Sequence, residues 1–237
     1  MIGIHQLQFI PWVPYFFKII KSDIFVFLND VQYQKNGIQN RNQIKTPNGA
    51  AWLTLPVKAK LGELINEIEI ANFKSFEKIM RNLEMNYKKS PFFFKVYSIL
   101  ESAFSLGSNS LSEINYQIIC SILELLECKT KCFLSSQFKT SQAKEMLVLE
   151  IIEYFNEKVY ISGKGAFSYM DINKFQERGI DLYIYDFNYS NYPQLWKKRQ
   201  GFIPDLSIID LMFNHLDEMK SYIERNGTVY QLDQKRF

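Results

Sequence analysis

The sequence predicts an α/β protein with a Rossmann-like, mostly parallel sheet flanked by helices. Three observations lead to this class. The first thirty residues read strand, helix, strand, the order of a βαβ unit with a parallel strand pair. The second strand, "DIFVFLN", is a continuous apolar run, as expected for a strand covered on both faces. Helices and strands then alternate again after residue 140, which favours further units of the same kind.

The first unit follows from its hydrophobic spacing. "IGIHQ", residues 2–6, starts with apolar residues and reads as a strand. Apolar residues recur at spacings of three and four from Trp12 to Ile20, which predicts a helix in residues 12–23 with one buried face. The prolines of this segment fall in or before the first turn, where a missing N–H group costs little. Residues 23–29 form the second strand.

We expect the remaining chain to form one domain, residues 1–237, with a helical insertion at about residues 74–130. The polar segment 30–45 is expected to be a loop. The expected elements after it are strands at 51–57 and 65–71, helices at 74–87, 92–104, 112–126 and 141–156, a strand at 158–163, a helix at 167–179, a strand at 180–187, and helices at 206–216 and 217–227. Ser112, Ser141 and Ser207 are the expected N-caps, Asp210 completes a capping box with Ser207, Gly179 closes a helix, and Gly227 ends the ordered chain.

Composition narrows the class of function. Of 237 residues, 47% are hydrophobic and 22% are charged, which fits a globular protein with a sizeable core. A net charge of +3 without a basic stripe or recognition module argues against a nucleic-acid partner. The apolar stretches are too short to span a bilayer, and without a signal peptide we expect a cytoplasmic protein. Homodimer formation is left open.

The three cysteines do not indicate a metal site. Cys120, Cys128 and Cys132 match no zinc spacing and cannot all pair with one another. We therefore expect buried free thiols and no metal.

The ends of the first two strands carry the candidate catalytic residues. Open α/β sheets bind ligands at the carboxyl edge of their parallel strands, where His5 and Gln6 end one strand and Asp30 and Gln32 follow the next. A histidine beside a carboxylate is suited to general acid–base chemistry. The alternative stays open that His5 only bonds a backbone carbonyl at its strand end.

Two further segments carry ligand-binding side chains. "NDVQYQKNGIQNRNQIK", residues 29–45, is rich in amides and holds Lys35, Arg41 and Lys45 against the single acid Asp30, a composition that suits a small anionic ligand. An exposed loop whose amides cap its own turns is the alternative. Residues 191–210 also mix aromatic and polar groups, and a helix beginning near Ser207 would offer free N–H groups to an anion. "SGKGAFSY" is more simply read as a turn than as a phosphate loop.

The order of these motifs resembles the WbqC-like family. "IHQLQFIPWVPYFF", the strand ending "NDVQ", then "NRNQIK" and "WLTLPV" are similar to the family's opening, and "YPQLWKKRQGFIPDLSIIDLMFN" is similar to its second signature. Leu7, Pro14 and Asn29 depart from the proline, glycine and acid that are usual there. The resemblance implies a protein that acts beside enzymes of O-antigen and other surface-polysaccharide synthesis, with a proposed glycine (aminoacyl) transferase activity.

The function expected from this resemblance is acyl or aminoacyl transfer to the amine of a nucleotide-linked amino sugar. His5 would be the general base and Asp30 would orient it. An activated amino-acid or acyl donor would be the co-substrate, and ATP would be used in the ligase alternative given below. The expected substrate-binding residues are Gln6, Trp12, Tyr15, Gln32, Lys35, Asn40, Arg41, Asn42, Lys45, Tyr192, Gln194, Ser207 and Asp210, with the cations on phosphates, the amides on sugar hydroxyls and the rings stacked on a sugar or base.

Two other functions remain as alternatives. One is an ATP-dependent ligase that activates a carboxylate; its layout resembles that of HIGH-type nucleotidyl transferases, but Trp12 and Tyr15 stand in the histidine positions. The other is a sugar-nucleotide binding protein without catalysis.

Overall fold

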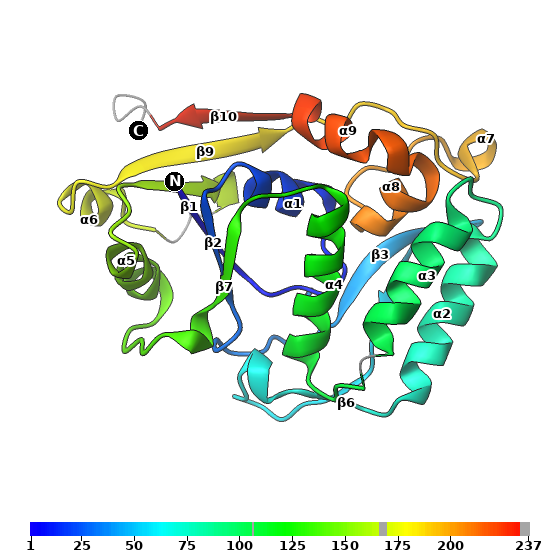
Figure 1. Ribbon diagram of the computed structural model, residues 1–237, viewed down its shortest axis with the longest axis horizontal. Coiled ribbons are helices and arrows are strands. Elements are labelled where there is room, and N and C mark those ends of the chain that lie inside the picture. Colours follow the sequence, from blue (N-terminus) through cyan, green and yellow to red (C-terminus); the bar gives the residue numbers. More distant parts are fainter. Residues whose placement is uncertain (106, 166–169, 233–237) are drawn as a thin grey trace.

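A computed structural model describes residues 1–105, 107–165 and 170–232, and it has the α/β architecture that the sequence predicts (Figure 1). The strands are β1 Ile2–Gln6, β2 Ile24–Leu28, β3 Arg41–Thr46, β4 Gly49–Thr54, β5 Val57–Lys58, β6 Glu69–Ile70, β7 Lys131–Leu134, β8 Val159–Gly163, β9 Asp181–Phe187 and β10 Gly227–Gln231. The helices are α1 Val13–Ile20, α2 Lys74–Tyr87, α3 Phe93–Phe104, α4 Leu111–Leu125, α5 Lys144–Tyr154, α6 Ile172–Gln176, α7 Lys197–Gln200, α8 Ile208–His215 and α9 Met219–Asn226. Short 3₁₀ helices lie at Ile65–Glu67, Ser135–Gln137 and Leu216–Glu218.

The central sheet has the strand order β10-β9-β8-β1-β2-β7 and is parallel except for β10. From β1 the chain moves to β2 on one side, and from β8 it moves to β9 on the other, so the strand order reverses between β1 and β8. These two strands pair only through Ile2–Tyr160 and Gly3–Ile161 and separate towards their carboxyl ends. Ligands of open α/β sheets bind at such a switch point.

Two hydrophobic clusters cover the faces of the sheet. Ile2, Ile4 and Val26 pack with residues of α5 and α6, whereas Phe25 and Phe27 pack with residues of α1, α8 and α9. The alternating side chains of β1 and β2 are therefore apolar on both faces, as expected for buried parallel strands. In Figure 1 the α5 and α6 helices accordingly lie apart from α1, α8 and α9.

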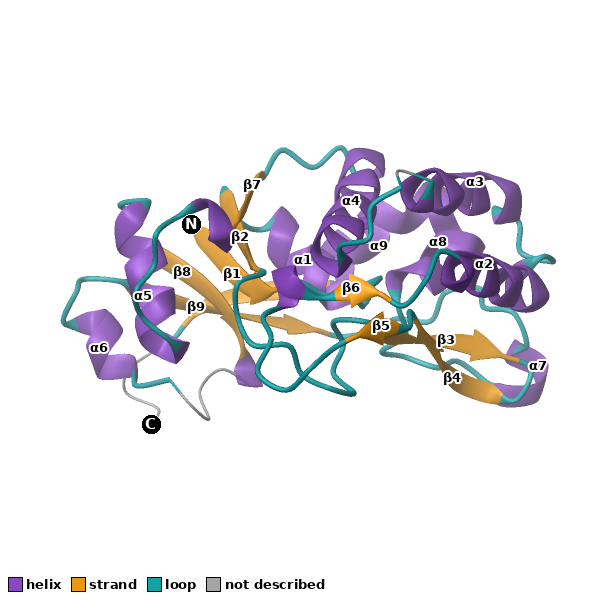
Figure 2. Cartoon of the chain, turned by 90° about the horizontal axis from the view of Figure 1, so that it is seen from below, coloured by secondary structure: helices purple, strands orange, loops and turns teal. Residues whose placement is uncertain are grey.

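The segment between β6 and β7 is helical, as expected. The α2, α3 and α4 helices pack together beside α8, and the aromatic rings of Tyr87 and Phe213 stack with centroids 4.5 Å apart. Figure 2 shows the β3–β4 hairpin outside the central sheet, next to these helices. The insertion thus lies against one side of the hairpin that follows the first βαβ unit (Figure 2).

Several sequence predictions of secondary structure were wrong. The second half of the expected loop 30–45 forms β3, which pairs with β4 in antiparallel register. Residues 65–71 form a 3₁₀ turn and the two-residue β6 rather than one strand. The short strand β7 was not predicted, and Gly227 begins β10 instead of ending the ordered chain.

The predicted helix caps also need correction. Ser207 caps α8 as expected, with its Oγ accepting from the Ile209 N–H group, but the Asp210 carboxylate bonds elsewhere and forms no capping box. Ser110, not Ser112, caps α4, and α5 begins after Ala143 with no cap from Ser141. Helix α6 begins after Asp171; residues 166–169 of the expected helix lie outside the described residues, and Gly179, with a φ of +64°, follows its end as predicted.

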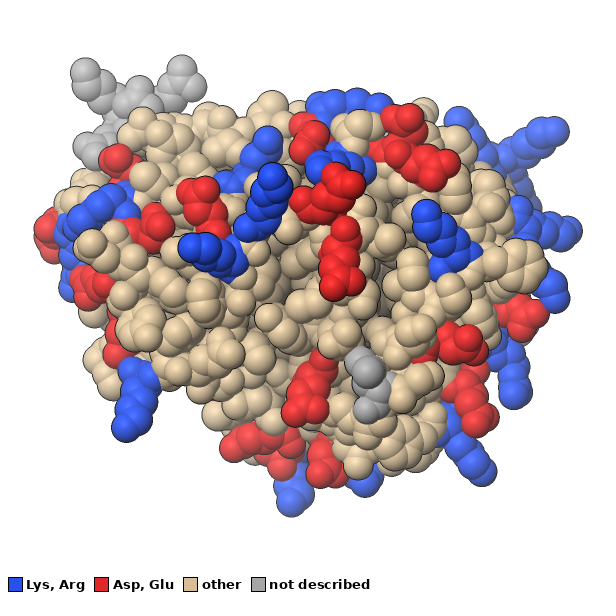
Figure 3. Space-filling model, viewed as in Figure 1, with Lys and Arg blue, Asp and Glu red and all other residues tan. Residues whose placement is uncertain are grey.

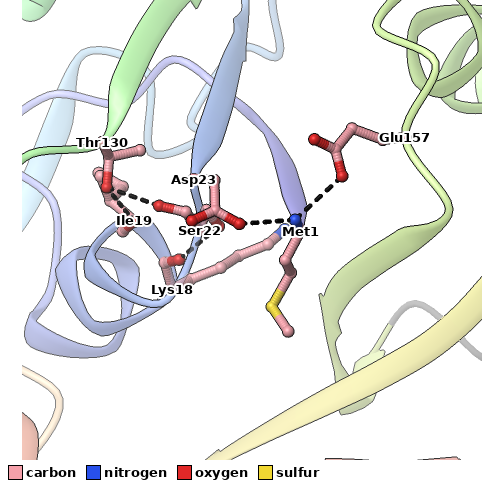
Figure 4. Close-up of polar contacts among 7 residues, drawn as sticks. All are labelled: Met1, Lys18, Ile19, Ser22, Asp23, Thr130 and Glu157. Atoms are coloured by element: carbon pink, nitrogen blue, oxygen red, sulfur yellow. Dashed lines mark hydrogen bonds and ion pairs between the residues drawn. The ribbon is translucent and has the colours of Figure 1, made fainter.

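Polar contacts fix the amino-terminal edge of the sheet (Figure 4). The Met1 amino group lies 2.7 Å from Asp23 Oδ2 and 2.9 Å from Glu157 Oε2. The Thr130 hydroxyl lies 2.8 Å from the carbonyl oxygens of both Ile19 and Ser22. The end of α1 is thereby held against the start of β7.

Neither a patch of like charge on the face in Figure 3 nor a disulfide among the three cysteines is present in the described residues. Positive and negative side chains are interspersed over the face in Figure 3. The three cysteines are free and half-buried rather than fully buried. Within the described residues, no helix has the length and apolar character needed to cross a membrane, and no group of three potential metal ligands occurs.

Candidate functional site

A cavity of about 620 Å³ lies at the switch point of the sheet. That volume is within the range of small-molecule sites. Its polar and charged lining comes from β1, α1, the ends of β8 and β9, and the segments that follow them: His5, Lys18, Ser162, Lys164, Asp186 and Asp205. Its aromatic lining is Trp12, Tyr160, Tyr185, Phe187 and Tyr189.

Lys18 is the most unusual side chain of this cavity. Only 3% of it is exposed, and its Nζ donates a 2.6 Å hydrogen bond to the Ile4 carbonyl oxygen. The ammonium also lies 5.8 Å and 5.6 Å from the ring centroids of Phe25 and Tyr160. Burial lowers the pKa of Lys18 to about 7, because the charged form loses its hydration. Much of this lysine is therefore an uncharged amine at neutral pH.

His5 lies in the same cavity, half-buried beside Tyr15 at a ring distance of 5.0 Å. Burial, followed by the positive charge of Lys18, lowers the pKa of His5 to about 3, so the imidazole is neutral at physiological pH. Its Nε2 lies 3.3 Å from the amide nitrogen of Gln8. Because that nitrogen can only donate, Nε2 accepts and the ring proton is on Nδ1. Within the described part of the chain, Nδ1 has no hydrogen-bond partner.

The rim of the cavity is built from the ends of β8 and β9. Lys164 and Asp186 form an ion pair of 2.6 Å. A Cβ atom at Gly163 would lie 3.2 Å from the Tyr185 hydroxyl, so glycine allows this ring to pack closely on β8. Burial raises the pKa of Tyr185 to about 12, and burial together with Asp205 raises the pKa of Tyr189. Both phenols therefore stay protonated at neutral pH.

Asp30 does not join His5, contrary to the expected catalytic pair. Ser135 donates a hydrogen bond to Asp30 Oδ1, and Asp30 is absent from the lining of the switch-point cavity. The adjacent Asn29 accepts from the Ser136 N–H group at 3.0 Å. The residues that follow β2 thus form hydrogen bonds with the turn after β7, because the two strands are parallel neighbours and end at the same edge of the sheet.

A second set of predicted residues forms a buried network rather than a cleft wall. Asp210 is 0% exposed and accepts from Tyr87 at 2.9 Å, Tyr192 at 2.7 Å and Gln194 at 2.9 Å. Lys45, also 0% exposed, donates to Gln194 at 2.8 Å and to the Gly201 carbonyl at 2.6 Å. Burial raises the pKa of Asp210 and lowers that of Lys45, while their opposite charges counteract both shifts.

A third set lines a separate cavity of about 560 Å³ between the loop 33–41 and the segment 57–62. Lys35, Asn40 and Arg41 contribute to it. These residues were expected to bind the same substrate as His5, but His5 lines the switch-point cavity and not this one. The single expected site is therefore replaced by two cavities and one buried network.

The other predicted residues mostly serve the fold. Tyr15 is fully buried and donates to the Gln6 carbonyl oxygen at 3.0 Å, so its ring is closed to a ligand in this conformation. The Gln6 side chain accepts from Gln39 at 2.9 Å. The others have these contacts: Asn42 donates to the Ile10 carbonyl at 2.9 Å, Ser207 donates to the same carbonyl at 2.7 Å, Gln32 is exposed and bridges to Leu64, and Trp12 lines the switch-point cavity.

Sequence reasoning missed Lys18 and the glycine-rich end of β8. A single lysine within the apolar run "PYFFKII" was the available signal for Lys18, since a cation on a buried helix face needs a partner. The segment containing Ser162, Gly163 and Lys164, interpreted as a turn, lines the cavity.

Comparison with known proteins agrees with this arrangement of motifs. The sequence model of the WbqC-like protein family matches residues 6–222. The chain is 31% identical over 226 residues to the uncharacterized protein Rv1507c of Mycobacterium tuberculosis, covering 94% of this chain and 96% of that protein. No solved structure matches the chain. The protein therefore belongs to the WbqC-like protein family.

Proposed function

We propose that the protein is an acyl or aminoacyl transferase that forms an amide on an amino sugar in the switch-point cavity. The observation that carries the proposal is the pair of neutral bases there: the Lys18 amine, with a pKa near 7, and the neutral imidazole of His5. Perturbed pKa values in a cavity at a switch point are typical of catalytic sites.

Lys18 is better suited than His5 to be the general base. The His5 imidazole is a weak base, because the pKa of its protonated form is about 3. The Lys18 amine, whose protonated form has a pKa of about 7, can accept a proton at neutral pH. The sugar amine attacks the carbonyl carbon of an activated acyl donor and gives its proton to Lys18 Nζ. The bond to the leaving group then breaks, and the leaving group departs with the electron pair. The base expected from the sequence is thus replaced by the lysine beside it.

His5 has a different role in this proposal. Its Nδ1–H group is a donor without a partner within the described residues. Such a donor in a low-dielectric site can stabilise the negative charge that develops on the carbonyl oxygen. The aromatic lining from Trp12, Tyr185 and Tyr189 suits the faces of a sugar ring, and the tyrosine hydroxyls suit its polar groups.

The test is a search for amide products followed by one matched pair of variants. The protein is incubated with nucleotide-linked amino sugars and acyl or aminoacyl thioesters, and products are identified by mass spectrometry. Lys18→Met is compared with Lys21→Met, which removes an exposed lysine from the end of the same helix. We expect Lys18→Met to lower kcat by about 10²-fold or more with little change in sugar affinity, and Lys21→Met to be unchanged.

Other results would exclude the proposal. Product formation only when ATP and a free carboxylic acid replace the thioester would identify a ligase. Sugar binding without product, with every donor, would identify a binding protein. Unchanged turnover in Lys18→Met would remove the assigned base.

A further inference from the structure

We propose that the cavity of about 560 Å³ beside the β3–β4 hairpin is an anion site for a phosphate- or diphosphate-bearing ligand, with Arg41 as its anchor. This cavity shares no lining residue with the switch-point cavity. The inference therefore does not depend on the transfer chemistry and can be tested by binding alone.

The charge of the cavity has one sign. Lys35, Arg41 and Lys60 line it, and no carboxylate does so among the described residues. None of these three cations forms an ion pair with another described residue. The nearby carboxylate of Glu63 accepts the backbone N–H group of Lys60 instead. Three cations gathered in one cavity without acids repel one another, and an anion of two or more charges relieves that repulsion.

Arg41 is held in a fixed orientation. Its guanidinium lies 4.3 Å from the ring centroid of Trp52, which stands diagonally across the hairpin, since Arg41 pairs with Thr54. One terminal nitrogen donates to the Asn36 carbonyl oxygen. The Nε atom is buried and has no partner in the described structure. A planar group fixed on two sides with an unused donor is suited to phosphate oxygens.

The loop that carries Lys35 is shaped by close backbone contacts. Asn36 has a φ of +64°, a left-handed conformation that asparagine tolerates better than most residues. A Cβ atom at Gly37 would lie 2.3 Å from Gln39 Oε1 and 2.8 Å from the Gln34 carbonyl, so the tight turn requires glycine. This turn directs the Asn36 carbonyl to Arg41 and places Lys35 at the cavity.

Two neutral polar side chains of the lining, Tyr33 and Asn40, are already hydrogen-bonded within the protein. The Tyr33 hydroxyl donates to Asn40 Oδ1 at 2.9 Å, and the Asn40 amide donates to the Leu55 carbonyl at 2.9 Å. Burial raises the pKa of Tyr33, and the positive charge of Arg41 opposes this rise. The positive charge of Arg41 thus acts on the cavity wall, and the three cations are the charged donors that the cavity offers to a ligand.

The test measures binding of inorganic pyrophosphate by isothermal titration calorimetry, with acetate as a singly charged comparison. Arg41→Gln removes the anchor charge, and Lys35→Ala/Lys60→Ala removes two exposed cations with little risk to folding. The control, Lys89→Ala/Lys95→Ala, removes two exposed lysines elsewhere and changes the net charge equally. Folding of each variant is checked by thermal unfolding.

We expect pyrophosphate to bind more tightly than acetate. Arg41→Gln should weaken its binding by about tenfold or more, as expected for the loss of a charged hydrogen bond. The cavity double variant should weaken it severalfold, and the control should leave it unchanged. The proposal is wrong if pyrophosphate fails to bind at low salt, or if the control weakens binding as much as the cavity variants do.

Discussion

The side-chain amine of Lys18 lies 2.6 Å from the carbonyl oxygen of Ile4, one residue beyond the last pair that joins β1 to β8. A helix side chain thereby donates to the β1 backbone where β8 has moved away. The hydrogen bond fixes the amine at the switch point, while burial removes its charge near neutral pH. The buried site between α1 and β1 thus both holds this amine in position and lowers its pKa.

The activity of the proposed transferase should depend on the ionisation of this lysine. Only the uncharged amine accepts a proton, so kcat/KM should rise with pH and level off above a pKa of about 7. A pH–rate profile of the wild-type protein measures this value. In Lys18→Arg the rise near pH 7 should disappear along with most of the activity, because arginine stays protonated. Persistence of that rise would assign it to another group.

His5 should make the protein less stable in mild acid. Its pKa is about 3 when folded and 6.5 when unfolded, so between these pH values the unfolded chain binds a proton that the folded one does not. The free energy of unfolding should therefore fall as pH decreases from 6.5 to 3, by about 1.4 kcal/mol for each pH unit from this group alone. Urea unfolding at several pH values measures the slope.

The second histidine supplies the control for this experiment. His215 is the other histidine of the chain, and burial lowers its pKa too. His5→Asn should flatten the pH dependence between 6 and 4, whereas His215→Gln should retain the larger part of it. Equal slopes in His5→Asn and the wild type would show that the imidazole at position 5 takes up its proton in the folded state.

Asp210 should be essential for stability. In the wild type, two tyrosine hydroxyls and one amide donate hydrogen bonds to the Asp210 carboxylate. Asparagine has one acceptor oxygen, and its NH₂ group would face donors that it cannot accept from. We expect Asp210→Asn to lower the free energy of unfolding by about 3 kcal/mol, because buried donors lose their partner. Asp217→Asn, an exposed acid in the next turn, should change it little. Chemical denaturation compares the two.

A side chain at position 227 should lower the stability of the protein. A Cβ atom there would lie 2.2 Å from the Phe17 ring, which is itself fully buried against Tyr185 and Phe187. Gly227→Ala should destabilise the protein by about 1–3 kcal/mol through overpacking. In a Phe17→Leu background, Gly227→Ala should destabilise the protein less. A double-mutant cycle should therefore show a coupling energy of about 0.5 kcal/mol or more. Additive effects would mean that the backbone moves instead.

The sequence predicted the elements whose periodicity is local. The βαβ start, α2, α3, β8 and β9 follow from runs and spacings of apolar residues that a few neighbours suffice to explain. Strand β3 was missed because its buried positions include Asn42 and Lys45. Their partners, the Ile10 carbonyl, Gln194 and Gly201, are far away in the chain, so hydrophobic patterning does not reveal the burial.

The same limit applies to the site. Placing His5 at the carboxyl edge of the sheet required only the strand order expected for a βαβ unit, and it lines the switch-point cavity. The predicted partner of His5 was wrong, because Asp30 accepts a hydrogen bond from Ser135 instead. Ser135 follows β7, a strand that was not predicted from the sequence. The lysine that does accompany His5 was visible only as a charge on an apolar helix face.

By itself, the amino-acid sequence determined the fold class, the family motifs and the edge of the sheet where polar groups collect. Only the tertiary structure decided that those groups separate into a switch-point cavity, a cationic cavity and a buried network around Asp210. The physical reason is that secondary structure follows from interactions between near neighbours in the chain. The burial of a charge, and therefore its pKa and its partner, depends on segments that meet only when the chain is folded.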